Sequence, residues 1–163
     1  MSGHTTHPYE IRPLARNDAP ALLDFYRGLP DWIVHWYDPF PGIEEQRLNE
    51  HMRQAGAREA VSYVLCSADG AIHGHGFVLA VDTDAPVFGI GLCEAAIGRG
   101  LGRALMKRVI DEADRCGATS VTLTVFKDNA RARRLYESFG FTCTGEASCR
   151  STGDSYAMRR FRP

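Results

Sequence analysis

The sequence lacks the features that mark several large classes of protein. No run of apolar residues approaches the roughly 18 that a membrane-spanning helix needs, and the opening MSGHTTHPYE has neither the basic segment nor the apolar core of a secretory signal. An excess of charge is also missing, because 19 Lys and Arg residues balance 20 Asp and Glu residues to a net charge of −1. Binding to nucleic acid or to an anionic membrane needs a basic surplus. We therefore expect a cytoplasmic protein, a monomer or a homodimer, that has neither a nucleic acid nor a membrane as partner.

Cysteine is scarce, and its spacing fits neither a disulfide framework nor a metal site. The five cysteines are Cys66, Cys93, Cys116, Cys143 and Cys149, and no two of them form a CxxC pair. An odd number without metal-ligand spacing is typical of reduced thiols. Repeats, low-complexity tracts and linkers are absent as well, so the sequence predicts one domain over residues 1–163.

The hydrophobic periodicity predicts an α/β fold. Alternating segments predict strands at residues 9–14, 60–67, 71–81, 87–94, 120–126, 141–147 and 154–161. Helical spacing predicts helices after a capping Asp18, from Ile43 to about Ala55, from about 101 to 116 and from about 129 to 139. The segment Leu29–Gly42 holds three of the prolines and is expected to be irregular. The order β-α-α-β-β-β-α-β-α-β-β implies one mixed, mostly antiparallel sheet with helices on both faces.

The segment IGRGLGRALMKRV, Ile97 to Val109, is a glycine loop between a strand and a helix. Such a loop suits a phosphate group, because glycines let the backbone approach and the amides at the helix start point at the anion. The P-loop pattern GxxxxGK[ST] is absent. The dinucleotide pattern GxGxxG also fails, because Arg103 or Leu105 stands where its last glycine belongs.

Two blocks of sequence resemble the motifs of the GNAT N-acetyltransferase superfamily. Residues 97–102 are similar to its acyl-CoA-binding motif, [Q/R]-x-x-G-x-[G/A], except that Ile97 stands at the first position. Residues 123–141 are similar to its second motif, L-x-V-x-x-x-N-x-x-A-x-x-L-Y-x-x-x-G-F. The matching positions there are Leu123, Val125, Asn129, Ala132, Leu135, Tyr136, Gly140 and Phe141. With the flanking strands, the resemblance covers essentially the whole chain.

The resemblance implies the GNAT fold and an N-acetyltransferase that moves an acetyl group from acetyl-CoA to a primary amine. It implies direct attack by the amine of a small molecule or a protein, with no metal and no covalent enzyme intermediate. The cofactor-binding residues that it implies are Leu92, Cys93, Gly98, Arg99, Gly100, Leu101, Gly102, Arg103 and Asn129. The backbone of Leu92 and Cys93 would hold the pantetheine arm. Asn129 is equally consistent with an ordinary helix cap.

Tyr136 has two interpretations. Its spacing from Leu135 and Phe139 is that of a core residue on a helix. The resemblance instead implies that its hydroxyl is the general acid that protonates the departing thiolate. A phenol, with a pKa of about 10, stays protonated at neutral pH and can donate to a thiolate whose conjugate acid has a pKa of about 8.5.

The general base, the acceptor and the class of function remain open at this stage. Glu94, His35 and the pair His73 and His75 are candidate bases. The aromatic residues Trp32, Trp36, Tyr37 and Phe40 either line an acceptor cleft or pack in the core. Two non-enzymatic alternatives are an acyl-CoA-sensing domain, which would not need Tyr136, and a nucleotide-binding interaction domain, which the failed P-loop and dinucleotide patterns disfavour.

Overall fold

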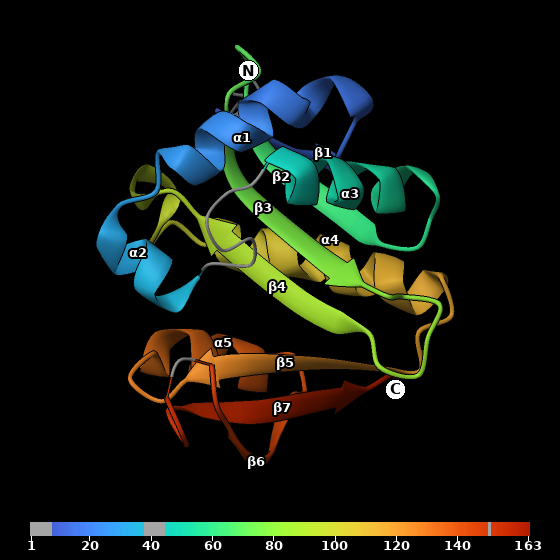
Figure 1. Ribbon diagram of the computed structural model, residues 1–163, viewed down its shortest axis with the longest axis vertical. Helices are drawn as coiled ribbons and strands as arrows, with labels where there is room; N and C mark the ends of the chain where they lie inside the picture. Colours follow the sequence, from blue (N-terminus) through green and yellow to red (C-terminus); the bar gives the residue numbers. More distant parts are fainter. Residues whose placement is uncertain (1–7, 38–44, 150) are drawn as a thin grey trace, which may run out of the picture.

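The computed structural model describes residues 8–37, 45–149 and 151–163, which fold around one seven-stranded sheet (Figure 1). Its strands are β1 (Tyr9–Pro13), β2 (Val61–Ser67), β3 (Ile72–Leu79), β4 (Val87–Leu92), β5 (Ser120–Phe126), β6 (Thr142–Ala147) and β7 (Ser155–Phe161). They lie in the order β1-β2-β3-β4-β5-β7-β6. Neighbouring strands are antiparallel except β4 and β5, which are parallel. The predicted mixed, mostly antiparallel sheet is confirmed.

Helices cover the two faces of this sheet unequally. The helices are α1 (Ala19–Arg27), α2 (Asp31–Trp36), α3 (Glu45–Gly56), α4 (Leu101–Arg115) and α5 (Ala130–Ser138), with short 3-10 turns at Arg16–Asp18 and Glu94–Ala96. Figure 1 shows α1 and α3 in front of β2 and β3, and α4 behind them. Within the described ranges, no helix combines the length and the apolar character needed to cross a bilayer.

Each face of the sheet has its own hydrophobic core. The larger core joins α4 and α5 to the back of the sheet and includes Leu105, Val109 and Tyr136. The smaller core joins α1, α2 and α3 to the front and includes Leu22, Ile33 and Leu48. Since apolar burial is the main stabilising contribution to folding, these two cores fix where α2, α4 and α5 stand around β4 and β5.

The structure differs from the sequence prediction in two local features. The segment expected to be irregular contains α2, because Pro30 stands before the first turn, where it does not break the helix. The Pro30 carbonyl accepts hydrogen bonds from the Ile33 and Val34 amides at 2.9 and 3.1 Å. Asp18 does not cap α1; its carboxylate instead accepts from the Ala15 amide and pairs with Arg12. The expected helix start at Ile43 lies outside the described residues.

Candidate active site

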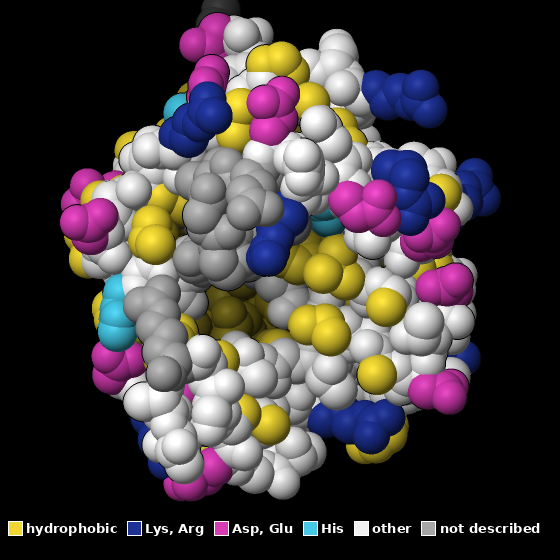
Figure 2. Space-filling view, in the orientation of Figure 1, with side chains coloured by type: hydrophobic (Ala, Val, Ile, Leu, Met, Phe, Trp, Pro, Cys, Tyr) yellow, Lys and Arg dark blue, Asp and Glu magenta, His cyan; other side chains and the backbone are white. Residues whose placement is uncertain are grey.

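Strands β4 and β5 part soon after they meet. Val87 pairs with Thr122, whose amide donates to the Pro86 carbonyl at 2.9 Å. Beyond this point β4 follows β3 while β5 follows β7, and the two strands diverge (Figure 1). Figure 2 shows the surface hollowed between them, with hydrophobic side chains in its depth. The divergence exposes one edge of β4 to a ligand that pairs with its backbone.

The backbone groups at the end of β4 point in alternating directions. The Cys93 amide donates to the His73 carbonyl on the β3 side at 2.8 Å, and the Cys93 carbonyl accepts from the Ala96 amide at 3.0 Å. Because successive residues of a strand point their amides to opposite sides, the Leu92 amide faces β5 and the hollow. Both main-chain groups of Cys93 are therefore used within the protein, which leaves Leu92 as the better backbone candidate.

The glycine loop has the geometry of an anion cradle. Gly98 and Gly100 have φ values of 79° and 76°, a left-handed conformation that glycine adopts most readily. The carbonyl of Gly100 accepts from the Ala104 amide at 3.2 Å, so α4 begins directly after the loop. The first amides of a helix have no partner within it and attract an anion. A Cβ placed on Gly100 would meet no atom within 4 Å, so there is open space at the cradle.

Three arginines stand around this loop: Arg99 and Arg103, which the motif resemblance predicted, and Arg131, which it did not. The Arg99 guanidinium lies 5.2 Å from the ring centre of Tyr9, and that of Arg103 lies 5.6 Å from that of Phe139. The third is Arg131 in α5, whose Nη2 atom lies 3.7 Å from the place of a Cβ on Gly98. Its position two residues after Asn129 was the only signal in the sequence that pointed to it.

Ile97 stands where the related motif has Gln or Arg. Its side chain packs against the smaller core, beside the helices on the front of the sheet. It therefore contributes to packing, whereas Arg131 brings a positive charge to the same loop from another helix.

Asn129 and Tyr136 stand at the start and near the end of α5. The Asn129 side-chain oxygen accepts from the Ala132 amide at 3.2 Å, so the helix-cap interpretation is confirmed. Tyr136 is 9% exposed, and its ring contacts the rings of Phe88 and Phe141. Burial raises the pKa of Tyr136 to about 12, which keeps its hydroxyl protonated at neutral pH. It is therefore both a core residue and a possible proton donor.

Tyr37 closes the front side of β4. Its ring occupies the space that a Cβ on Gly91 would fill, so only glycine allows this approach. Its hydroxyl lies 2.7 Å from that of Tyr26 in α1. Burial raises the pKa of Tyr37, and the charge that Tyr136 would carry raises it further. Tyr37 stands directly after α2, and Tyr136 stands in α5.

Helix α2 is tied to the loop after β5. His35 Nε2 and the indole Nε1 of Trp36 lie 3.1 and 2.9 Å from the two carboxylate oxygens of Asp128. These contacts, the one from His35 first, lower the pKa of Asp128. The His35 ring also stacks on Phe126 at 5.4 Å. These contacts join α2, on the front of the sheet, to the loop that follows β5, directly before Asn129.

The remaining candidate residues have different surroundings. His73 contacts Ser67 at 2.8 Å, and Glu94 is an exposed residue of a 3-10 turn. Trp32 and Trp36 are 44% and 38% exposed, so they are surface residues of α2. Phe40 lies outside the described residues.

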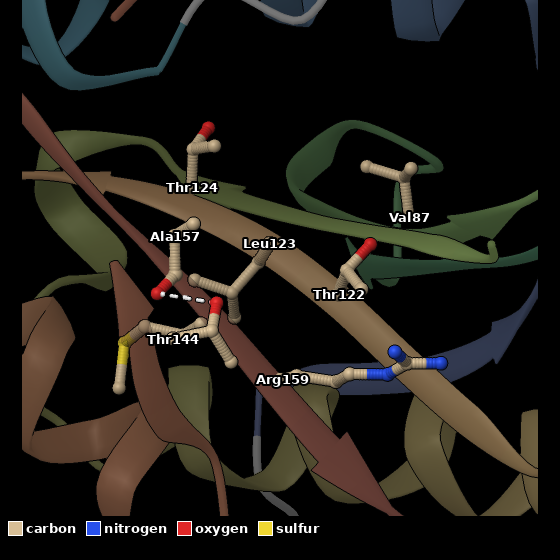
Figure 3. A pocket seen from close by; sticks show the side chains of 8 residues that line it. Val87, Thr122, Leu123, Thr124, Thr144, Ala157 and Arg159 are labelled. Carbon is tan, nitrogen blue, oxygen red and sulfur yellow. Dashed lines mark hydrogen bonds between the residues drawn. The ribbon is translucent and has the colours of Figure 1, made fainter. Parts of the chain in front are cut away.

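A shallow pocket of about 360 Å³ lies over β5, β6 and β7, beside the point where Val87 meets Thr122 (Figure 3). It is lined by Val87, Thr122, Leu123, Thr124, Thr144, Ala157, Met158 and Arg159. The Arg159 guanidinium donates a hydrogen bond from Nη2 to the Ser120 hydroxyl at 2.8 Å, and this bond fixes its position. The pocket is a mostly apolar surface with one charged side chain, Arg159, at its side.

Comparison with known proteins shows which protein family this chain is similar to. A family model described as "Acetyltransferase (GNAT) family" matches residues 29–141. The mycothiol acetyltransferase of Corynebacterium efficiens is 31% identical over 142 residues, which are 83% of this chain and 47% of that protein. The L-amino acid N-acetyltransferase AaaT of Escherichia coli K12 is 31% identical over 121 residues, 68% of this chain and 69% of that protein. The chain thus spans about half the length of the first relative.

A solved structure has the same fold. The PaiA N-acetyltransferase of Thermoplasma acidophilum, determined in complex with coenzyme A, superposes with a TM-score of 0.78 at 15% identity. The match covers 96% of this chain and 100% of that one. At this identity the likeness concerns the fold.

Proposed function

The chain belongs to the GNAT acetyltransferase family, and on this premise we propose that it transfers an acetyl group from acetyl-CoA to a primary amine. The acceptor is a small molecule or a protein, and a single domain carries the whole site. One observation carries the proposal: the parallel strands β4 and β5 part after Val87 and Thr122, and the glycine loop that follows β4 and helix α5 that follows β5 meet at the open end, where Arg131 approaches Gly98.

The residues around the divergence fit an acyl-CoA molecule. The exposed edge of β4 at Leu92 would pair with the amide groups of the pantetheine arm. The amides of residues 98–103 would bind the pyrophosphate, with the open space at Gly100 admitting it and Arg131 adding charge. Asn129, Arg99 and Arg103 flank the same path. Bound acetyl-CoA supplies the activated thioester.

Tyr136 is proposed as the general acid. Its hydroxyl stays protonated at neutral pH, because burial holds its pKa at about 12. As the thiolate departs, this hydroxyl would donate its proton to the sulfur. General acid catalysis of this kind contributes roughly 10²–10⁴-fold to a rate.

Ligand-dependent thermal stability tests the cofactor first. Acetyl-CoA should raise the melting temperature, whereas NAD and ATP at equal concentration should not, because only a ligand of the native state stabilises it. Release of free thiol from acetyl-CoA in the presence of an amine panel then separates an enzyme from an acyl-CoA-sensing domain. Stabilisation by NAD or ATP instead would contradict the assignment of the loop.

A further inference from the structure

A chain of five polar side chains runs from Tyr37, beside β4, into the protein, and it has no part in the proposed binding of acetyl-CoA. The hydroxyl of Tyr37 lies 2.7 Å from that of Tyr26, which lies 2.5 Å from Nδ1 of His75. Nε2 of His75 lies 2.8 Å from the Ser62 hydroxyl, which lies 3.0 Å from Nε2 of His51. The five residues come from α1, α3, β2, β3 and the segment after α2, so the tertiary fold alone brings them together.

The interior members of this chain are shielded from water. His75 is 0% exposed, His51 2% and Ser62 7%. Burying polar groups costs free energy unless each one is hydrogen-bonded. An apolar core would fill this space at lower cost, so a hydrogen-bonded polar chain at this depth invites a functional explanation.

The chain can be hydrogen-bonded in either direction. In one direction Tyr37 donates to Tyr26, and Tyr26 donates to Nδ1 of His75. Nε2–H of His75 then donates to Ser62, which donates to His51. In the other direction these bonds reverse, and Tyr37 donates to the main-chain carbonyl of His75, 3.4 Å away. A chain with two such states can pass a proton along its length, since each hydroxyl and imidazole is both donor and acceptor.

The outer end of the chain lies at the reaction site. Tyr37 covers Gly91 on β4, one residue before Leu92, whose amide faces the hollow. A charge on Tyr136 would raise the pKa of the Tyr37 phenol, so the field of the proposed general acid reaches the outer end of the chain. The inner end holds the His75 imidazole; burial lowers its pKa, so it is uncharged near neutral pH and its Nδ1 can take a proton passed along the chain.

We propose that Tyr37, Tyr26 and His75 form a proton relay that deprotonates the attacking amine. The proposal rests on the acetyl-transfer function proposed above, and it assigns the general base that the sequence left open. Tyr37 is the member that contacts the amine, and Tyr26 and His75 act through it. Ser62 and His51 position His75.

The proton balance closes within the site. In the transfer an N–C bond forms, the C–S bond breaks, the nitrogen loses one proton and the sulfur gains one. The nitrogen's proton passes to the Tyr37 oxygen, the Tyr37 proton to Tyr26, and the Tyr26 proton to Nδ1 of His75. Tyr136 gives its proton to the sulfur. After the products leave, the imidazolium gives up its proton through the relay to water at the site, and the Tyr136 phenolate takes a proton from water, which restores both groups.

The relay is tested by removing its middle hydroxyl. Tyr26→Phe keeps the ring but breaks the connection between Tyr37 and His75, and Tyr37→Phe breaks its outer end if Tyr26→Phe does not fold. The matched control is Tyr63→Phe, a buried tyrosine on the opposite face of the sheet. For each variant we would measure kcat with a primary alkylamine and with hydroxylamine, the Kd of acetyl-CoA and the melting temperature.

With the alkylamine, kcat should fall at least about tenfold in Tyr26→Phe while the Kd of acetyl-CoA is unchanged. With hydroxylamine the loss should be much smaller, because this weakly basic nucleophile gives up its proton without a strong base. An equal loss with both nucleophiles would indicate a structural role and overturn the relay, as would an unchanged kcat. A wild-type protein that acetylates no amine would overturn the proposed function itself, so the two failures are distinguishable.

Discussion

The ring of Tyr37 lies directly over Gly91, in the space that a Cβ at that position would fill. This contact fixes the phenol beside β4 at the divergence, where the proposed reaction would bring the amine to the thioester.

The first prediction concerns Gly91→Ala. The added methyl group must displace the Tyr37 ring, which should lower kcat at least about tenfold, or roughly 1.4 kcal/mol of transition-state stabilisation. Gly56→Ala is the control, because a Cβ there meets no atom within 4 Å. Steady-state kinetics of both variants check this, and full activity in Gly91→Ala would contradict the placement of Tyr37.

The second prediction concerns Tyr136→Phe. Loss of the buried hydroxyl should lower kcat by at least about tenfold, within the range of general acid catalysis. The KM for acetyl-CoA should change little, because the ring contacts with Phe88 and Phe141 remain. An unaltered kcat would remove Tyr136 from the mechanism.

The third prediction concerns Arg131→Gln. If the guanidinium beside Gly98 binds the pyrophosphate, its loss should weaken coenzyme A binding by about tenfold, or roughly 1.4 kcal/mol. Binding of pantetheine, which lacks the pyrophosphate, should not change. Isothermal titration of both ligands measures this, with exposed Arg134→Gln as the control. Equal weakening of both ligands would show that Arg131 acts on the fold instead.

The fourth prediction concerns stability in acid. Burial lowers the pKa of His51 to about 4 and, together with the charge of His51, lowers that of His75 further below its ordinary value. An unfolded imidazole takes up its proton near pH 6.5. Above about pH 6.5 the imidazoles are uncharged in both the folded and the unfolded protein, so the free energy of unfolding has its full value. It decreases as the pH falls, by about 2 kcal/mol at pH 5 for His51 alone.

Urea unfolding near neutral pH and near pH 5 checks this expectation. His51→Gln should lose less free energy of unfolding between the two conditions than the wild-type protein does, because glutamine does not titrate. The same loss in both proteins would show that His51 takes up its proton equally in the folded and unfolded states.

The sequence predicted the sheet and the long helices because alternation and helical spacing reflect burial on one face. It also indicated the loop, Asn129 and Tyr136, since these belong to local motifs. It could not show that Arg131 reaches Gly98 or that Tyr37 covers Gly91, because these contacts join segments far apart in the chain. The alternation placed His73 and His75 on one face, but only the packing of α1 and α3 makes His75 the buried member.

The most direct test of the account is a single reaction in which free thiol and acetylated amine are both quantified. With acetyl-CoA and a primary amine, the wild-type protein should produce the two in equal amounts, and Tyr136→Phe should produce both at least about tenfold more slowly. A protein that binds acetyl-CoA but yields neither product with any amine of the panel would contradict acetyl transfer and leave the chain an acyl-CoA-binding domain.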